Sequence, residues 1–177
     1  FSVTAQMLSP LARGLFARAI GESGAFMSAT PRSAAEATGV ALGTQLRAPS
    51  LAALRAVSAM ELVMATNGRP NALRFWPIVD GWFITESPHV TFAAGRQAKV
   101  PLLAGWNSQE GSWRGLVRGT PTPDSVRAVF SRLYGANAPY AARAYPAESD
   151  EQAMQALTDL SGDQFIGYAT WKWLEEH

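Results

Sequence analysis

The sequence predicts part of an α/β protein that is rich in helix and contributes two or three strands to a larger central sheet. Two continuous apolar runs, at residues 14–20 and 99–107, are typical of strands buried on both faces. Two strands and one doubtful extended segment leave buried backbone groups unpaired, so we expect partner strands outside this sequence. Residues 1–177 are therefore interpreted as the central portion of a single domain.

Composition argues against several function classes. The 177 residues are 47% hydrophobic and 16% charged, which is typical of a globular protein. A net charge of +1, from 15 basic and 14 acidic residues, gives no electrostatic case for a nucleic-acid or membrane partner. With no cysteine and only two histidines, a disulfide or a metal site is not expected. No apolar run approaches membrane-spanning length.

Helix signals dominate the first part of the chain. Residues 1–8 predict a short helix that ends at Ser9-Pro10. Ser33 and Glu36 have the spacing of a capping box and predict a helix that reaches about Leu46. Two more short helices are expected to begin at Ser50 and Ser58.

The rest of the chain alternates loops, one extended segment and helices. Residues 66–71 predict a loop, and residues 72–84 are extended with a turn at Asp80-Gly81. A short helix is expected from Pro88 to Gly95. Beyond Gly119 the pattern is helical, with starts expected at Pro123, Ser149 and Asp163.

The stretch Gly21-Glu22-Ser23-Gly24-Ala25 is similar to the G-x-S-x-G turn that presents a catalytic serine. Such a turn needs a strand before the serine and a helix directly after it. The strand is predicted, but the next helix signal comes after Pro31, and Ala25 replaces the second glycine. We therefore interpret Ser23 as a strand-end residue that hydrogen-bonds nearby groups, with a nucleophile as the alternative.

Two ordered blocks of the chain resemble type-B carboxylesterases, the family that includes the cholinesterases. Residues 1–24 contain S-V, L-S-P, G-L-F, R-A-I and S-G in the family's order, and residues 77–111 contain P-x-x-D-G, V-P-L-L, G-x-N and E-G. The resemblance implies the α/β-hydrolase fold. It also implies a nucleophilic serine a few residues before Phe1, in a G-E-S-A-G turn. Ser23 would then hydrogen-bond beside the catalytic acid and histidine.

The resemblance implies one catalytic residue within the chain. In this fold the triad runs serine, acid, histidine along the sequence. The family's usual glutamate follows the strand V-P-L-L-x-G, and Glu110 in "GWNSQEG" matches it. Glu110 would accept the Nδ1–H of the histidine. In the family this histidine comes far after the acid, so the resemblance places it beyond His177, and chain order excludes His89, which precedes the acid. From the bare sequence, a solvated loop carboxylate is the simpler interpretation.

Other residues admit two interpretations each. Leu73 and Phe75 precede the P-x-x-D-G block, where the family's acyl pocket is lined, and they could equally be core residues. Arg114 and Arg118 could bind an anionic group of a substrate or lie on a solvated helix face.

The resemblance therefore implies a carboxylic ester hydrolase that acts on a small-molecule ester through an acyl-enzyme, with no metal or organic cofactor. The 177-residue chain alone is expected to be inactive, and the remainder of the hydrolase domain is needed for a complete fold. The alternative is a cholinesterase-like module that has lost the triad and serves in binding or adhesion. The presence or loss of the elbow serine would distinguish the two.

Overall fold

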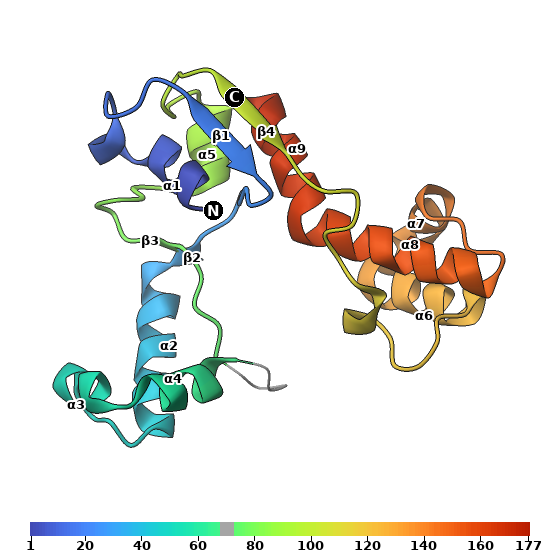
Figure 1. Ribbon diagram of the computed structural model, residues 1–177, viewed down its shortest axis with the longest axis horizontal. Helices are drawn as coiled ribbons and strands as arrows, with labels where there is room; N and C mark the ends of the chain where they lie inside the picture. The colour runs from blue at the N-terminus through green and yellow to red at the C-terminus, as the bar shows by residue number, and fades with distance from the viewer. Residues whose placement is uncertain (68–72) are drawn as a thin grey trace.

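The computed structural model describes residues 1–67 and 73–177. Its α-helices there are α1 (Ser2–Leu8), α2 (Arg32–Gln45), α3 (Leu51–Ala56), α4 (Ala59–Thr66), α5 (Pro88–Ala93), α6 (Pro123–Tyr134), α7 (Ala138–Ala144), α8 (Asp150–Gly162) and α9 (Tyr168–Glu176) (Figure 1). The strands are β1 (Ala19–Glu22), β2 (Thr30–Pro31), β3 (Ile78–Val79) and β4 (Leu102–Gly105). Most of the loop predicted at 66–71 lies outside the described residues. The described chain is helix-rich with few strands, as the sequence predicts.

β4 lies within the second apolar run, whereas β1 shares only Ala19 and Ile20 with the first, and the two strands pair with each other. β1 and β4 are parallel, with Ala19 opposite Leu102 and Glu22 opposite Gly105. Each strand is shorter than its apolar run; β1 begins only at Ala19, after a turn in which Gly14 has a φ of +78°. β2 and β3 form a separate parallel pair, so the extended segment at 72–84 does not join the first sheet within the described residues.

The expectation that these strands are buried on both faces is wrong for this structure. Ile20 and Leu103 lie opposite each other in the register, and their exposed fractions are 57% and 68%. Ala19 and Gly21, on the other face of β1, are buried. The pair therefore has one covered face and one open apolar face.

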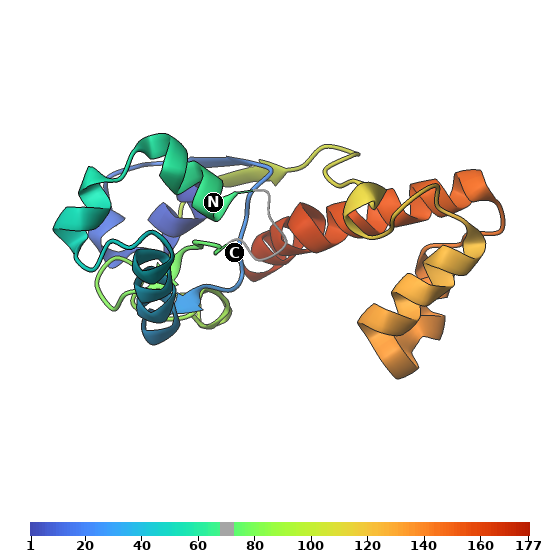
Figure 2. The ribbon, with the colours of Figure 1, turned by 90° about the horizontal axis from the view of Figure 1, so that it is seen from below.

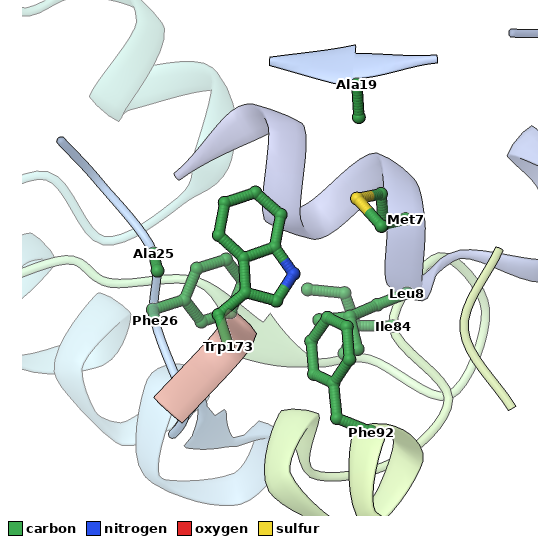
Figure 3. Close-up of a cluster of buried hydrophobic side chains, with 8 residues drawn as sticks. All are labelled: Met7, Leu8, Ala19, Ala25, Phe26, Ile84, Phe92 and Trp173. Carbon is green, nitrogen blue, oxygen red and sulfur yellow. The ribbon is translucent and has the colours of Figure 1, made fainter. Parts of the chain in front are cut away.

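The covered face packs on the main hydrophobic core, which gathers residues from both ends of the chain (Figure 3). Its buried members are Met7, Leu8, Ala19, Ala25, Phe26, Ile84, Phe92 and Trp173. The Trp173 indole fits beneath the strand only because Gly21 has no side chain, since a Cβ there would lie 2.8 Å from Cη2 of the indole. The last helix is thereby fixed to β1.

A continuous rod of residues 150–176, which we call the α8–α9 rod, joins this core to a second one (Figures 1 and 2). The predicted helix start at Ser149 is confirmed, because its side chain caps α8. The separate start predicted at Asp163 is wrong; residues 163–167 form a π-helical turn inside the rod. The second core lies between α6 and α8 and consists of Val126, Val129, Phe130, Ala153, Leu157 and Leu160.

Side-chain caps mark the starts of α3 and α4. Ser50 caps α3, and Ser58 with Glu61 forms a capping box on α4, as predicted. The capping box predicted at Ser33 is wrong, because α2 already begins at Arg32. The Glu36 carboxylate instead accepts a 2.8 Å hydrogen bond from Nε of Arg32, one turn earlier on α2.

Replacing Trp173 by alanine tests the anchor between the rod and the strands. Because the indole is only 1% exposed, we expect the Trp173→Ala variant to lose about 3–5 kcal/mol of unfolding free energy. Trp171, on the same helix but 47% exposed, is the matched control, and its alanine variant should lose less than about 1 kcal/mol. Urea denaturation of the variants measures both free energies of unfolding. Equal losses would contradict the claim that Trp173 anchors the rod to the strands.

Candidate active site

The candidate site lies at the carboxyl ends of β1 and β4. Because the strands are parallel and Glu22 pairs with Gly105, the residues that follow both strands emerge at the same edge. Ser23 follows β1, and the loop of residues 106–112, which we call the acid loop, follows β4. This edge is where α/β proteins place their functional groups.

Ser23 turns its backbone sharply at that edge. Its φ is +46°, in the left-handed region, which costs a residue with a side chain about 1 kcal/mol. The backbone N–H of Ser23 donates a 2.9 Å hydrogen bond to the carbonyl of Gly105, and its hydroxyl donates to Oε1 of Glu110. No helix follows directly, since the next one, α2, begins at Arg32. Ser23 therefore lacks the helix that a nucleophile elbow requires.

Glu110 is held through one carboxylate oxygen. Besides the Ser23 hydroxyl, Oε1 accepts from the backbone N–H of Asn107 at 2.8 Å and from the Asn107 side-chain amide at 2.9 Å. Within the described part of the chain, no hydrogen bond or ion pair engages Oε2. The carboxylate is thus oriented by one oxygen and keeps the other as an acceptor.

These bonds also hold Glu110 ionised. Its pKa is lowered from the ordinary value, first by the Ser23 hydroxyl and then by the backbone N–H of Asn107. Desolvation opposes this shift, and the Asn107 side-chain amide adds to it. A lowered pKa keeps the free oxygen negatively charged at neutral pH, which suits it to accept a hydrogen bond from an imidazole ring.

The acid loop is seated on the α8–α9 rod at two glycines. A Cβ on Gly111 would lie 2.7 Å from Cβ of Ser161 and would overlap the backbone of Gly162. The N–H of Ser112 donates to the Ser161 hydroxyl at 3.2 Å. At the other end of the loop, Trp106 passes over Gly167, where a Cβ would lie 3.4 Å from the indole nitrogen. Both contacts flank the π-helical turn, which sequence reasoning missed.

A cavity of about 270 Å³ opens between the acid loop and the rod. Glu110 lines it together with Asp159, Asp163 and Tyr145, whose hydroxyl donates to Oδ2 of Asp163 at 2.7 Å. Burial is the main cause that raises the pKa of Tyr145 well above its ordinary value, and the bond to Asp163 adds to it. Tyr145 is therefore a neutral hydrogen-bond donor here.

Neither histidine lies at this site. His89 pairs through Nδ1 with the carboxylate of Glu176 at 3.0 Å. Nε2 of His177 lies 2.8 Å from the carbonyl of Val100, which precedes β4 and so sits at the end of that strand away from Glu110.

The two residues predicted to line an acyl pocket are not brought to Glu110. Neither Leu73 nor Phe75 lines the cavity beside it, and the Phe75 side chain is 53% exposed. Their neighbour Trp76 does line a cavity, one of about 500 Å³ that it shares with Phe26 and Tyr168. Sequence reasoning assigned no role to Trp76. It also missed Asn107, which stands in the G-x-N motif.

The described residues offer neither a cluster of metal ligands nor a membrane-spanning helix. No group of three or more His, Asp or Glu side chains there could hold a metal ion. No helix in residues 1–67 and 73–177 combines the length and apolar character needed to cross a bilayer.

Removing the Ser23 hydroxyl should raise the pKa of Glu110 toward its ordinary value, because this bond is the largest cause of its lowering. The lowered pKa stabilises the fold above the unfolded-state value, and this stabilisation is lost as pH falls through the folded-state value. In Ser23→Ala we therefore expect this stabilisation of the fold to be lost at a higher pH than in the unmodified protein. NMR titration of the Glu110 side-chain carbonyl measures the pKa of Glu110 in each variant. Ser108→Ala, in the same loop, is the control, and an unchanged Glu110 pKa in Ser23→Ala would contradict the assignment.

A side chain at position 111 should dislodge the acid loop. Gly111→Ala places a methyl group against Ser161 and Gly162, so the loop must move away from the rod. We expect a lower free energy of unfolding and a raised Glu110 pKa, since its hydrogen bonds shift with the loop. Gly115→Ala is the control, because a Cβ there meets nothing within 4 Å. Equal stability and equal Glu110 pKa in the two variants would show that the contact of Gly111 with Ser161 and Gly162 does not position the acid loop.

Comparison with known proteins gives the family. Residues 1–172 match the carboxylesterase family. Fumonisin B1 esterase of Sphingopyxis macrogoltabida is 32% identical over 167 residues, which cover 89% of this chain and 30% of that protein. Para-nitrobenzyl esterase of Bacillus subtilis is 33% identical over 118 residues, which cover 62% of this chain and 24% of that protein.

A third similar protein is cholinesterase 1 of Branchiostoma lanceolatum, which is 31% identical over 139 residues. The matched segment covers 68% of this chain and 39% of that protein. Thus the chain spans between 24% and 39% of the length of these three relatives. The resemblance found in residues 1–24 and 77–111 is confirmed, and the chain belongs to the carboxylesterase family.

Proposed function

We propose that this chain is the central portion of a serine carboxylesterase domain and supplies its catalytic acid, Glu110. The observation that carries the proposal is the state of the Glu110 carboxylate. Ser23 and Asn107 hold Oε1, while Oε2 stays unengaged among the described residues. A triad acid needs this combination of fixed orientation and a free charged acceptor.

In the proposed mechanism, a serine outside residues 1–177 attacks the ester carbonyl as a histidine takes its proton. The histidine then passes that proton to the departing alcohol, and water attacks the acyl-enzyme to release the acid. Glu110 remains ionised throughout. Its Oε2 accepts the imidazole Nδ1–H, fixes the tautomer and stabilises the imidazolium. Ser23 acts through Glu110, by holding Oε1 and keeping the carboxylate charged.

The place of Phe1 supports a nucleophile from the preceding segment. A Cβ on Gly24 would lie only 2.7 Å from the backbone nitrogen of Phe1. The chain therefore reaches Phe1 beside Ser23-Gly24, and a serine a few residues earlier would emerge near the same edge of the sheet. The engagement of His89 with Glu176 and of His177 with Val100 supports a base from outside this chain.

The substrate is proposed to be a small-molecule carboxylic ester, as the printed names of the esterase relatives suggest. Leu73 and Phe75 remain the proposed acyl-pocket residues on the strength of the family resemblance. The half-exposed Phe75 ring is free to contact a ligand. The alternative, a module without a triad, has no use for an oriented carboxylate with a free oxygen, so the state of Glu110 favours the enzyme.

Kinetics of the intact protein test this proposal. With p-nitrophenyl butyrate, we expect Glu110→Gln to lower kcat about 10⁴-fold, because the neutral amide no longer fixes the histidine tautomer. Glu151→Gln, an exposed carboxylate on α8, should leave kcat unchanged. Ser23→Ala should lower kcat only about 10- to 100-fold, as loss of a supporting hydrogen bond does. The 177-residue chain alone should not hydrolyse this ester.

Three results would contradict the proposal. Full activity in Glu110→Gln would remove Glu110 from the triad. Complete loss of both activity and covalent labelling by an organophosphate in Ser23→Ala would make Ser23 the nucleophile. An intact protein that is not labelled and does not hydrolyse any ester would favour the binding module.

A further inference from the structure

Another cavity, separate from the one beside Glu110, lies between the turn at Trp113–Gly115 and helix α6. Its volume is about 580 Å³, in the range of small-molecule sites. Three arginines line it, Arg114, Arg118 and Arg132, and no aspartate or glutamate does. It shares no lining residue with the cavity that contains Glu110.

The three guanidinium groups carry no counter-charge in the described structure. None of them forms a salt bridge with any residue of 1–67 or 73–177. By contrast, Arg127 on the same helix α6 pairs with Asp124. Three uncompensated positive charges around one hollow raise the local potential and favour the entry of an anion.

Two of the three arginines are also partly fixed in place. The Arg114 guanidinium stacks on the Trp113 ring at 4.4 Å from its centre, which leaves its N–H edges free. An Arg132 terminal nitrogen donates to the carbonyl of Leu116 at 3.2 Å. Such prior ordering lowers the entropy lost when the side chains close on a ligand.

The remaining lining is largely apolar and includes Leu116, Val117 and Val129. Planar guanidinium groups match the geometry of carboxylate and phosphate oxygens and bind them through paired hydrogen bonds. We propose that this cavity binds a small multivalent oxyanion, with the charged groups on the arginines and any carbon skeleton against the apolar wall. The site is independent of the proposed ester hydrolysis.

Isothermal titration of the protein with citrate, pyrophosphate and acetate, at constant ionic strength, tests the proposal. We expect saturable binding of citrate or pyrophosphate and none of monovalent acetate. Citrate binding would assign the site to polycarboxylates, and pyrophosphate binding alone would assign it to phosphates. Binding of neither multivalent anion would overturn the proposal.

Variants locate the binding. Arg118→Gln and Arg132→Gln should each weaken it at least about tenfold, the effect of losing one hydrogen bond to a charged group. Arg118→Lys keeps the charge without the paired geometry and should weaken binding less than Arg118→Gln. Arg127→Gln, which removes a charge from the same helix outside the cavity, should change the affinity less than about twofold. If Arg127→Gln and Arg118→Gln weaken binding equally, the anion is attracted by the overall positive charge of the helix and not by the cavity, and the proposal is overturned.

Discussion

Close packing at glycines holds the candidate site together. The α8–α9 rod contacts the strand pair where Trp173 fits beneath Gly21, and it contacts the acid loop where Gly162 meets Gly111. The rod therefore fixes both the strand that leads to Ser23 and the loop that carries Glu110. Because protein interiors are densely packed, an added methyl group at either glycine has no space to enter without moving an element.

The site's electrostatics follow from hydrogen bonds instead of ion pairs. Glu110 has no cationic partner among the described residues, and the Ser23 hydroxyl and Asn107 N–H groups lower its pKa. Arg114 is close in sequence, yet its guanidinium stacks on Trp113. The negative charge at the sheet edge is thus left for an incoming group. This arrangement would suit an imidazolium that forms during each catalytic cycle.

Local signals in the sequence predict much of this structure. Cap residues such as Ser58 and Ser149 mark helix starts, because a side-chain oxygen must satisfy free N–H groups there. The same rule failed at Ser33, because α2 begins at Arg32 and Ser33 already lies inside the helix. The burial of the strands was also mispredicted, since an apolar run indicates a strand without indicating what covers each face.

The candidate site was predicted only in part. Family blocks lead to Glu110 and to a supporting role for Ser23, and the structure joins these two side chains by a hydrogen bond. The contact of Gly111 with Gly162 lies across the fold, and no local pattern encodes it. Asn107 bonds to Glu110 only three residues away, so its position in the G-x-N motif was a local signal. The π-helical turn at 163–167 likewise arises where the rod meets the acid loop, and a helical repeat in the sequence does not reveal it.

The most direct test of the central claim is a crystal structure of the intact protein with a phosphonate bound covalently to its nucleophilic serine. The account predicts a histidine whose Nδ1 lies at hydrogen-bond distance, about 2.7–2.9 Å, from Oε2 of Glu110. Ser23 and Asn107 should still hold Oε1. A histidine paired with another carboxylate, such as Asp159 or Asp163, or a phosphonate attached to Ser23, would contradict the role given to Glu110.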